Sequence, residues 1–223
     1  ISAATNTGLK QANGDFIVFL DHDDLLAEQA LTELALAIDE NKQGRIFYSD
    51  EDLMSEAGRR IAPHFKSDWN PELLLAHNYV THLCCYQAFL IKELEGLRDG
   101  VDGAQDYDMI LRASRLVDPK HIIHIPKILY HWRMVEGSTA MSSGAKSYAT
   151  QAGLKALTDH MSVINNTAVV KHSDRDNFYR IYWPVPKEIP KVSIIIPTRD
   201  GLDFLKPCIE SLLSITSYSN YQV

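Results

Sequence analysis

The sequence predicts an α/β protein in which helices cover a mostly parallel sheet, and three observations carry this prediction. Short apolar runs of strand length alternate with segments whose apolar residues recur at helical spacing. Residues 16–20, FIVFL, are apolar throughout, as in a strand buried on both faces of a parallel sheet. A cluster of carboxylates follows this run directly, at the strand end where ligands bind in such sheets.

The first part of the chain contains two helix–strand units. Residues 2–12 are expected to form a helix that ends at Gly14, since glycine suits the left-handed turn there. A second helix is expected over 27–41, where leucine, alanine and isoleucine recur at helical spacing. It leads into a second strand at 45–49, RIFYS, which runs into an acidic turn.

The middle of the chain is less regular. Asn70 and Pro71 predict a helix start, because asparagine caps helices well and proline suits the first helical position. Further expected elements are a strand at 83–91, a helix at 106–114, two short strands around Pro126, a helix at 145–161, and a hairpin of 168–172 with 179–183.

A proline-rich linker is expected at 184–191, PVPKEIPK, which has three prolines in eight residues. Residues 192–197 then begin a fresh strand, followed by a loop and a helix. A single strand–helix unit cannot bury its own apolar faces. Residues 192–223 are therefore expected to open a second domain.

The net charge, the lengths of the apolar runs and the number of cysteines exclude some classes of function. A net charge of -7 argues against general affinity for nucleic acid or anionic membranes. No apolar run approaches the roughly 20 residues that span a bilayer. Three cysteines without metal-knuckle spacing indicate free thiols and a cytoplasmic location.

The acidic cluster after the first strand predicts a cation site. Asp21, Asp23 and Asp24 crowd three carboxylates together, and like charges about 4 Å apart repel by ~1 kcal/mol even in water. Hard oxygen ligands at this spacing suit Mg²⁺ or Mn²⁺, which also bind phosphate oxygens. The alternative is that Asp24 caps the helix of 27–41 while the other two are solvated.

Several segments together resemble family-two glycosyltransferases of the A-type nucleotide-sugar fold. They are GDFIVFLDHDDLL, YSDEDLM, FKSDWNPELLLAHNY, GAQDYDMILR and LYHWR followed by GST, in the order that the family has them. The resemblance covers most of 1–183 and implies a Rossmann-like, mostly parallel sheet with flanking helices. It is strongest to bacterial O-antigen and other surface-polysaccharide enzymes, several of which carry tandem domains.

The resemblance also implies a division of the chain. Residues 1–183 would be the C-terminal part of one glycosyltransferase domain, lacking its first strands. Residues 192–223 would be the first strand and helix of a second copy. Residues 192–197 would then be able to fill the missing first-strand position in the same or a neighbouring chain, which makes a homodimer an open alternative.

The resemblance assigns roles to individual residues. Asp21 and Asp23 match the metal-binding pair for Mn²⁺ or Mg²⁺, with His131 as a third ligand. Asp106 matches the catalytic base, although Gln105 stands where glutamate is more frequent. The remaining assignments are donor contacts at Asn6, His22 and Asp24, and acceptor contacts at Trp69, Asn78, Asp108, Trp132 and Arg133.

The residues themselves leave alternatives open. Spacing does not separate Asp106 from Asp108, since both would also suit the positive end of a helix. His131 would serve equally as a packed strand histidine. The acidic residues 50–52 are explained either by the acceptor side or by a solvated turn. The tryptophans are as typical of a core as of a sugar platform.

The implied reaction is inverting transfer of a sugar from a UDP or dTDP donor to a saccharide or lipid-linked saccharide, at the cytoplasmic face of the inner membrane. One alternative is a fragment that binds saccharide but lacks the donor pocket. Another is a haloacid dehalogenase-type phosphatase, which also places D-x-D after an apolar strand but uses the first aspartate as a nucleophile. That family has threonine or valine soon after the second aspartate, whereas Asp24, Leu25 and Leu26 follow here.

Overall fold

A computed structural model describes residues 1–134 and 143–223, with side chains described outside 135–147. The GST segment at 137–139 and the side chain of Ala145 lie outside this description. The chain divides into two compact units, Ile1–Trp183 and Pro184–Val223. The assignment of these units to parts of two glycosyltransferase domains stays a prediction.

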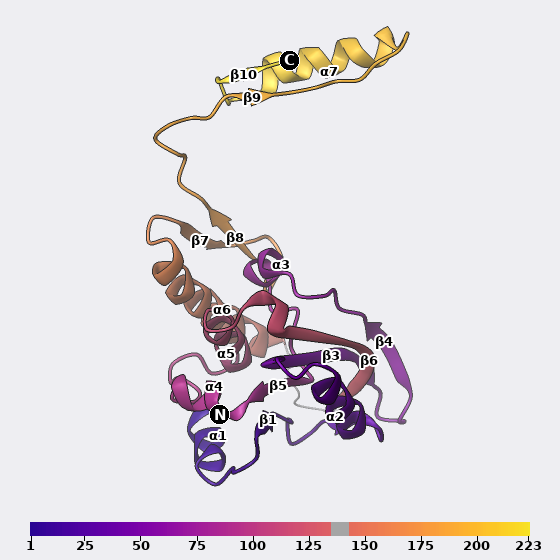
Figure 1. Cartoon of the computed structure of the whole chain (residues 1–223), viewed down its shortest axis with the longest axis vertical. Helices are drawn as coiled ribbons and strands as arrows, with labels where there is room; N and C mark the ends of the chain where they lie inside the picture. The colour runs from indigo at the N-terminus through magenta and orange to yellow at the C-terminus, as the bar shows by residue number, and fades with distance from the viewer. Residues whose placement is uncertain (135–142) are drawn as a thin grey trace. The chain divides into compact units, whose positions relative to one another are not determined.

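The first unit is a six-stranded sheet with helices on both faces (Figure 1). Its strands are β1 Phe16–Val18, β2 Leu25–Leu26, β3 Ile46–Met54, β4 Arg60–His64, β5 Cys84–Gln87 and β6 Ile122–Arg133. Its helices are α1 Ser2–Leu9, α2 Ala30–Glu40, α3 Pro71–Ala76, α4 Ala88–Glu93, α5 Gln105–Ser114 and α6 Ser143–Ile164, with a short 3₁₀ turn at Pro119–His121. A separate hairpin pairs β7 Val169–His172 with β8 Tyr179–Tyr182, as predicted.

The sheet is mixed, which corrects the expectation of a mostly parallel one. The strand order is β1-β5-β3-β6-β2, with β4 attached to β3. Among the described strands of this sheet, β3 and β6 pair in parallel, and the other pairings are antiparallel. The parallel pair is joined by a long connection that includes α3, α4 and α5, whereas β4 follows β3 after a short turn that reverses the chain.

The strand at 16–20 is shorter and less buried than its apolar sequence suggests. β1 covers Phe16–Val18, is only half-buried, and lies at the edge of the sheet against β5. An edge strand has a neighbour on one side only, so its apolar side chains are not enclosed on both faces. The preceding helix ends at Leu9 with Lys10 as its cap, and not at Gly14.

Two strand regions differ from expectation. The acidic segment Asp50–Asp52 belongs to β3 and is buried, so the solvated turn is excluded. Residues 122–133 form one continuous strand, β6, although its pairing with β3 shifts register near Pro126. Proline has no N–H to donate to a ladder, which accounts for the irregularity there.

The central strands alternate between two apolar layers, which fixes the register of the sheet. Ile46 and Tyr48 of β3 face the layer formed with α3, α4, α5 and α6, and Phe47 faces the layer formed with α2. Cys84 and Cys85 of β5 divide between the two layers in the same way and remain free thiols.

The second unit contains β9 Val192–Ser193, α7 Leu202–Ile215 and β10 Tyr221–Gln222. β9 pairs in parallel with β10 within this unit, and filling of the first-strand position by residues 192–197 stays a prediction. Large apolar side chains of this unit are exposed, as expected of an incomplete layer; they include Ile195, Leu202, Phe204, Leu213 and Ile215. None of the helices in the described parts of the chain has the length and apolar character to cross a membrane.

Candidate active site

One pocket contains a predicted metal ligand, Asp21, and the predicted base, Asp106. Asp21 follows β1, and Asp106 lies in the first turn of α5. Both line the same pocket, together with Thr81, His82 and Gln105. The acidic turn therefore faces the helix that carries the candidate base, and the two are not on opposite sides of the sheet.

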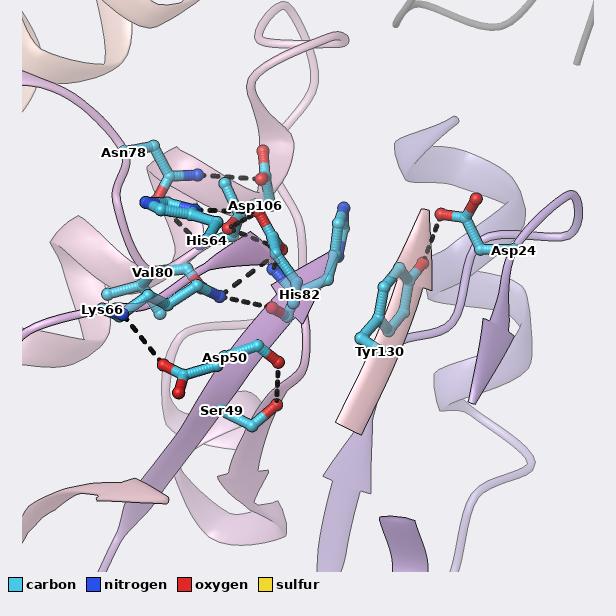
Figure 2. Close-up of polar contacts among 12 residues, drawn as sticks. Asp24, Ser49, Asp50, His64, Lys66, Asn78, Val80, His82, Asp106 and Tyr130 are labelled. Atoms are coloured by element: carbon cyan, nitrogen blue, oxygen red, sulfur yellow. Dashed lines mark hydrogen bonds and ion pairs between the residues drawn. The ribbon is translucent and has the colours of Figure 1, made fainter. Parts of the chain in front are cut away.

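Asp106 is held by one neighbouring amide. Asn78 donates from Nδ2 to Asp106 Oδ2 at 2.8 Å (Figure 2). Burial raises the pKa of Asp106, while the positive field of His82 acts in the opposite direction. Gln105 accepts a hydrogen bond from the Gly103 N–H at 2.7 Å, so it steadies the turn before α5. The result is a carboxylate with raised basicity at the wall of a pocket.

The four-residue acidic turn separates into two kinds of aspartate. Asp24 is 6% exposed and accepts from the Tyr130 hydroxyl at 2.6 Å and from the Arg133 N–H at 2.9 Å. The Tyr130 oxygen also accepts from the Asp21 N–H at 3.3 Å. Asp24 therefore fastens the turn to β6, and it neither caps α2 nor is available as a donor contact. The side chains of Asp21 and Asp23 remain 49% and 27% exposed.

His82 is a site residue that sequence reasoning missed. Its Nε2 lies 3.6 Å from Asp21 Oδ2, and its ring stacks on Tyr130 with centroids 4.7 Å apart. Trp132 meets the same ring edge-on at 5.8 Å. The residue lies just before β5, and because β5 runs antiparallel to β1, the start of β5 meets the turn that follows β1. The antiparallel pairing is the signal that would have identified it.

A buried ion pair between Lys66 and Glu51 fixes the backbone of the segment that carries Thr81 and His82. Lys66 has a fully buried side chain and donates from Nζ to the carbonyls of Val80, at 2.6 Å, and of His82. Glu51 lies 3.4 Å from Lys66 Nζ and accepts from Thr81 Oγ1 at 2.9 Å and from the His82 N–H at 3.2 Å. Val80, Thr81 and His82 are thus all hydrogen-bonded to the pair of Lys66 and Glu51 through their main chain or side chain.

The pKa of Glu51 reflects these contacts. Burial alone raises the pKa of a carboxyl group, but here the hydrogen bond from His64 and the charge of Lys66 outweigh it and lower the pKa to about 2. Burial lowers the pKa of Lys66, an effect that the charge of Glu51 opposes. Glu51 is therefore the anionic centre of the interior cluster.

The predicted metal ligands are not assembled into one group. Within the described residues, no three histidine, cysteine, aspartate or glutamate side chains are arranged to hold an ion. His131 is 7% exposed, and its Nδ1 lies 2.6 Å from Asp52 Oδ1. Asp52 also receives a hydrogen bond from Arg60 Nε at 2.6 Å. His131 thus lies in a strand-to-strand contact, and its role as a third ligand stays a prediction.

The carboxylates of Asp21 and Asp23 do fit a divalent ion of the magnesium type. Such an ion keeps several waters and is commonly bound by one or two carboxylates plus substrate phosphates. Asp21 and Asp23 are half-exposed, and Asp23 also lies 3.5 Å from the exposed His22. The two aspartates would hold Mn²⁺ or Mg²⁺ without a preformed cage.

Two of the predicted contact residues have structural partners instead. Asn6 forms a reciprocal pair with Leu97, donating to its carbonyl at 2.8 Å and accepting from its N–H at 2.9 Å. Asp108 is 1% exposed and accepts from Arg98 Nε at 2.9 Å and from Arg112 Nε at 2.7 Å. Both groups are thus hydrogen-bonded within the chain, and donor binding by Asn6 and acceptor binding by Asp108 stay predictions.

The other predicted acceptor contacts are dispersed. Trp69 packs on the core beside Tyr79, with ring centroids 6.5 Å apart. Trp132 packs on the opposite apolar layer and against His82. Arg133 donates through Nε to the Asp23 carbonyl, which ties it to the acidic turn. Of the five, Asn78 alone is hydrogen-bonded to Asp106 among the described contacts.

Comparison with known proteins identifies a family that the first part of the chain matches. Residues 1–94 match the family model described as Glycosyl transferase family 2. The match covers less than half of the 223 residues of the chain. The matched residues, which we call the family-2 segment, contain the acidic turn and His82, and the candidate base lies beyond their end.

Two curated relatives extend the similarity over the whole chain. A protein of Sinorhizobium fredii named y4gI is 43% identical over 224 residues, covering 100% of this chain and 24% of its own length. The O-antigen biosynthesis protein RfbC of Myxococcus xanthus is 39% identical over 220 residues, covering 99% of this chain and 17% of its own length. The chain therefore spans a quarter or less of the length of these relatives.

A solved structure shows the fold. The S. aureus TarS 1–349 structure, in complex with UDP-GlcNAc, matches with a TM-score of 0.53 at 17% identity, over 73% of this chain and 47% of TarS 1–349. At this identity the likeness concerns the fold alone. The family-2 segment and the helices after it have the A-type glycosyltransferase fold.

Proposed function

We propose that the protein transfers a sugar from a nucleoside-diphosphate donor to a hydroxyl group of a saccharide acceptor. The single observation that carries the proposal is that Asp21 and Asp106 line one pocket. One of them follows the strand end where a metal-bound diphosphate is expected, and the other is a partly buried carboxylate within reach of the same space.

Asp106 is the proposed general base. An acceptor hydroxyl is a poor nucleophile until its proton is removed, and a positioned carboxylate typically contributes ~10²- to 10⁴-fold in rate. The raised pKa makes Asp106 a stronger base than an exposed aspartate. As the acceptor oxygen bonds to the anomeric carbon, the proton passes to Asp106 and the bond to the diphosphate oxygen breaks. Attack from the face opposite the leaving group inverts the anomeric configuration.

Asp21 and Asp23 are the proposed metal ligands. A bound Mn²⁺ or Mg²⁺ would neutralise the charge that develops on the departing diphosphate. Tyr130 and Asp24 keep the turn in place through the hydrogen bonds at 3.3 and 2.6 Å described above. His82 adds a polar, half-enclosed ring beside Asp21 and would help exclude water from the diphosphate side.

The wider setting of the reaction rests on the relatives. RfbC is named for O-antigen biosynthesis, and the TarS structure contains UDP-GlcNAc. These support synthesis of a surface polysaccharide and a UDP or dTDP sugar as donor. A lipid-linked saccharide at the inner face of the membrane is the proposed acceptor. A homodimer stays a prediction.

The test uses the full-length protein with radiolabelled UDP and dTDP sugars, Mn²⁺, and membranes from a strain that lacks the gene as the source of acceptor. Asp106→Asn and Asp23→Asn are both expected to abolish transfer. Calorimetry with UDP or dTDP plus Mn²⁺ is expected to lose its signal only in Asp23→Asn. Full transfer by Asp106→Asn would place the base elsewhere, and a phosphorylated Asp21 trapped during turnover would favour a phosphatase.

A further inference from the structure

A second pocket also borders Asp106. It is lined by His77, Asn78, Ala149, Asn177 and Phe178, among others. Asp106 and Thr81 line this pocket as well as the one that contains Asp21. The candidate base thus borders both pockets.

We infer that this second pocket, which we call the hairpin pocket because β8 and the loop before it form one side, binds the acceptor saccharide and selects it. The inference rests on the proposed glycosyl transfer and names the surface that receives the second substrate. It assigns acceptor recognition to the loop between β7 and β8 and to α6, and not to Trp69, Asp108, Trp132 or Arg133.

The geometry matches the demand of an inverting reaction. The nucleophile must approach the anomeric carbon from the side opposite the leaving group. If the diphosphate lies beside Asp21, the acceptor must come from the far side of the sugar and pass its proton to Asp106. The hairpin pocket opens onto the same carboxylate from its own side. Two pockets that share the base are therefore expected, with one substrate in each.

The charge of the hairpin pocket favours a neutral polar ligand. Among the described residues that line it, Asp106 is the only carboxylate, and no lysine or arginine is present. None of the described lining residues therefore offers a cation to a diphosphate. Asn78 and Asn177 supply amides, and burial lowers the pKa of His77, with the charges of His64 and Arg175 acting in the same direction. A neutral imidazole both donates and accepts hydrogen bonds, as sugar hydroxyls require.

The loop that forms one side of the pocket is held firmly. Phe178 stacks on His77 with centroids 4.5 Å apart, and the Arg175 guanidinium lies 4.3 Å from the Phe178 ring centroid. Asn177 Oδ1 accepts from the Thr150 hydroxyl on α6 at 2.8 Å. These contacts bind the loop to α6 and to the end of α3, so the pocket is preformed and little ordering is needed when a ligand enters.

Close packing of the hairpin on α6 also supports a preformed pocket. Tyr179 stacks on Tyr107 at 5.9 Å, and its hydroxyl donates to the Thr150 carbonyl at 3.2 Å. A Cβ added at Gly153 would lie 2.0 Å from the Tyr179 hydroxyl oxygen, so only glycine permits this approach. The hairpin therefore docks on the helix through a specific contact and holds the pocket at a fixed distance from Asp106.

The inference is tested by filling the pocket from α6. Ala149→Trp in the full-length protein places a large side chain in the hairpin pocket, and Val163→Trp adds the same side chain at an exposed position of the same helix. With membranes of the gene-deletion strain as acceptor, Ala149→Trp is expected to raise the apparent KM for acceptor by at least about tenfold, and Val163→Trp to leave it unchanged. Calorimetric affinity for UDP or dTDP with Mn²⁺ is expected to stay within about twofold in both variants.

A second variant distinguishes an effect on the pocket from an effect of misfolding. Asn177 has a φ of 59°, a conformation that glycine adopts freely, so Asn177→Gly removes the amide without straining the loop. It is expected to raise the same KM with only a small fall in melting temperature, because the hydrogen bond from Thr150 is lost with the amide. An unaltered acceptor KM in both folded variants overturns the inference, as does loss of nucleotide binding in Ala149→Trp, which would place the donor in this pocket. Absence of both transfer and metal-dependent nucleotide binding in the wild-type protein would overturn the proposed function itself.

Discussion

The Asn78 amide and the Asp106 carboxylate form a hydrogen bond of 2.8 Å across 28 positions of sequence. Asn78 is itself oriented, because its Oδ1 accepts from the Thr81 N–H at 3.3 Å. A donor that faces a carboxylate stabilises the charged form, so this contact opposes the effect of burial on the pKa of Asp106. Asn78 therefore positions the proposed base and moderates its basicity.

Replacing Asn78 by leucine should shift the pH dependence of transfer. Loss of this hydrogen bond destabilises the charged form of the carboxylate, which raises the pKa of Asp106 further. The acid limb of the pH–rate profile should move to higher pH, measured with labelled donor and membrane acceptor. Asn13→Leu, at an exposed loop position, is the matched control. A uniform fall in rate at every pH would instead indicate a direct acceptor contact by Asn78.

Asp106 and Asp108 should respond to the same substitution in opposite ways. Asp106→Asn should lower transfer by about 10²-fold or more and leave the free energy of unfolding unchanged or higher, since a partly buried carboxylate with a raised pKa is removed. Asp108→Asn takes the charge from Arg98 and Arg112 in the interior and should cost about 3 kcal/mol of stability. Urea unfolding followed by tryptophan fluorescence, with transfer measured on the folded fraction, separates the two. Equal loss of transfer in both variants would contradict the assignment of the base.

Local sequence signals were sufficient for some parts of the site. The helix that begins at Gln105 was predictable because its first turn carries two aspartates, and the cap at Asn70 was predictable from the proline that follows it. The Asn70 side chain does accept from the Leu73 N–H at 2.9 Å. These features depend on residues within one turn of each other, so a short stretch of sequence contains all the physics that determines them.

Other parts depend on partners that are remote in sequence. The segment Asp50–Asp52 resembles a solvated turn because three adjacent carboxylates are costly to bury alone. In the structure each of them meets a cation or imidazole from another segment; the partners are His124 for Asp50, Lys66 and His64 for Glu51, and Arg60 and His131 for Asp52. His82 escaped notice for a related reason, because its place beside Asp21 follows from an antiparallel pairing that no local pattern specifies.

The stability of the chain should depend on Glu51 in acid. Its pKa of about 2 lies below the ordinary value of 4.5, so it contributes stability that is present above pH 4.5 and is lost as the pH falls through 2. A difference of this size corresponds to about 3 kcal/mol. The wild-type free energy of unfolding should therefore fall more steeply between pH 5 and pH 2 than that of Glu51→Gln, with other acidic groups cancelling in the comparison. Parallel curves for the two proteins would show that the unfolded and folded pKa values of Glu51 are alike.

Removing the cation of the same pair should act at neutral pH. Lys66→Met leaves Glu51 buried without its ammonium partner and frees the carbonyls of Val80 and His82. A loss of about 3 kcal/mol in the free energy of unfolding is expected. Lys92→Met, on the exposed side of α4, is the control. Stability equal to the wild type would mean that the pair contributes nothing beyond what a packed apolar side chain supplies.

Tyr130 connects the acidic turn to the central strand, and its hydroxyl is the point of attachment. Tyr130→Phe removes the donor to Asp24 and the acceptor for the Asp21 N–H, while the ring that stacks on His82 is retained. Since hydrogen bonds to charged groups contribute about 1.5–3 kcal/mol, a stability loss of about 2 kcal/mol is expected. Affinity for UDP or dTDP with Mn²⁺ should weaken as well, because Asp21 and Asp23 lose the turn that orients them.

Tyr182→Phe, on an exposed ring, is the control and should change neither stability nor nucleotide affinity. If Tyr130→Phe lowers stability but leaves metal-dependent nucleotide binding intact, then Tyr130 stabilises the fold without orienting the proposed ligands, and the contacts of Arg133 with Asp24 and Asp23 hold the turn in its binding geometry.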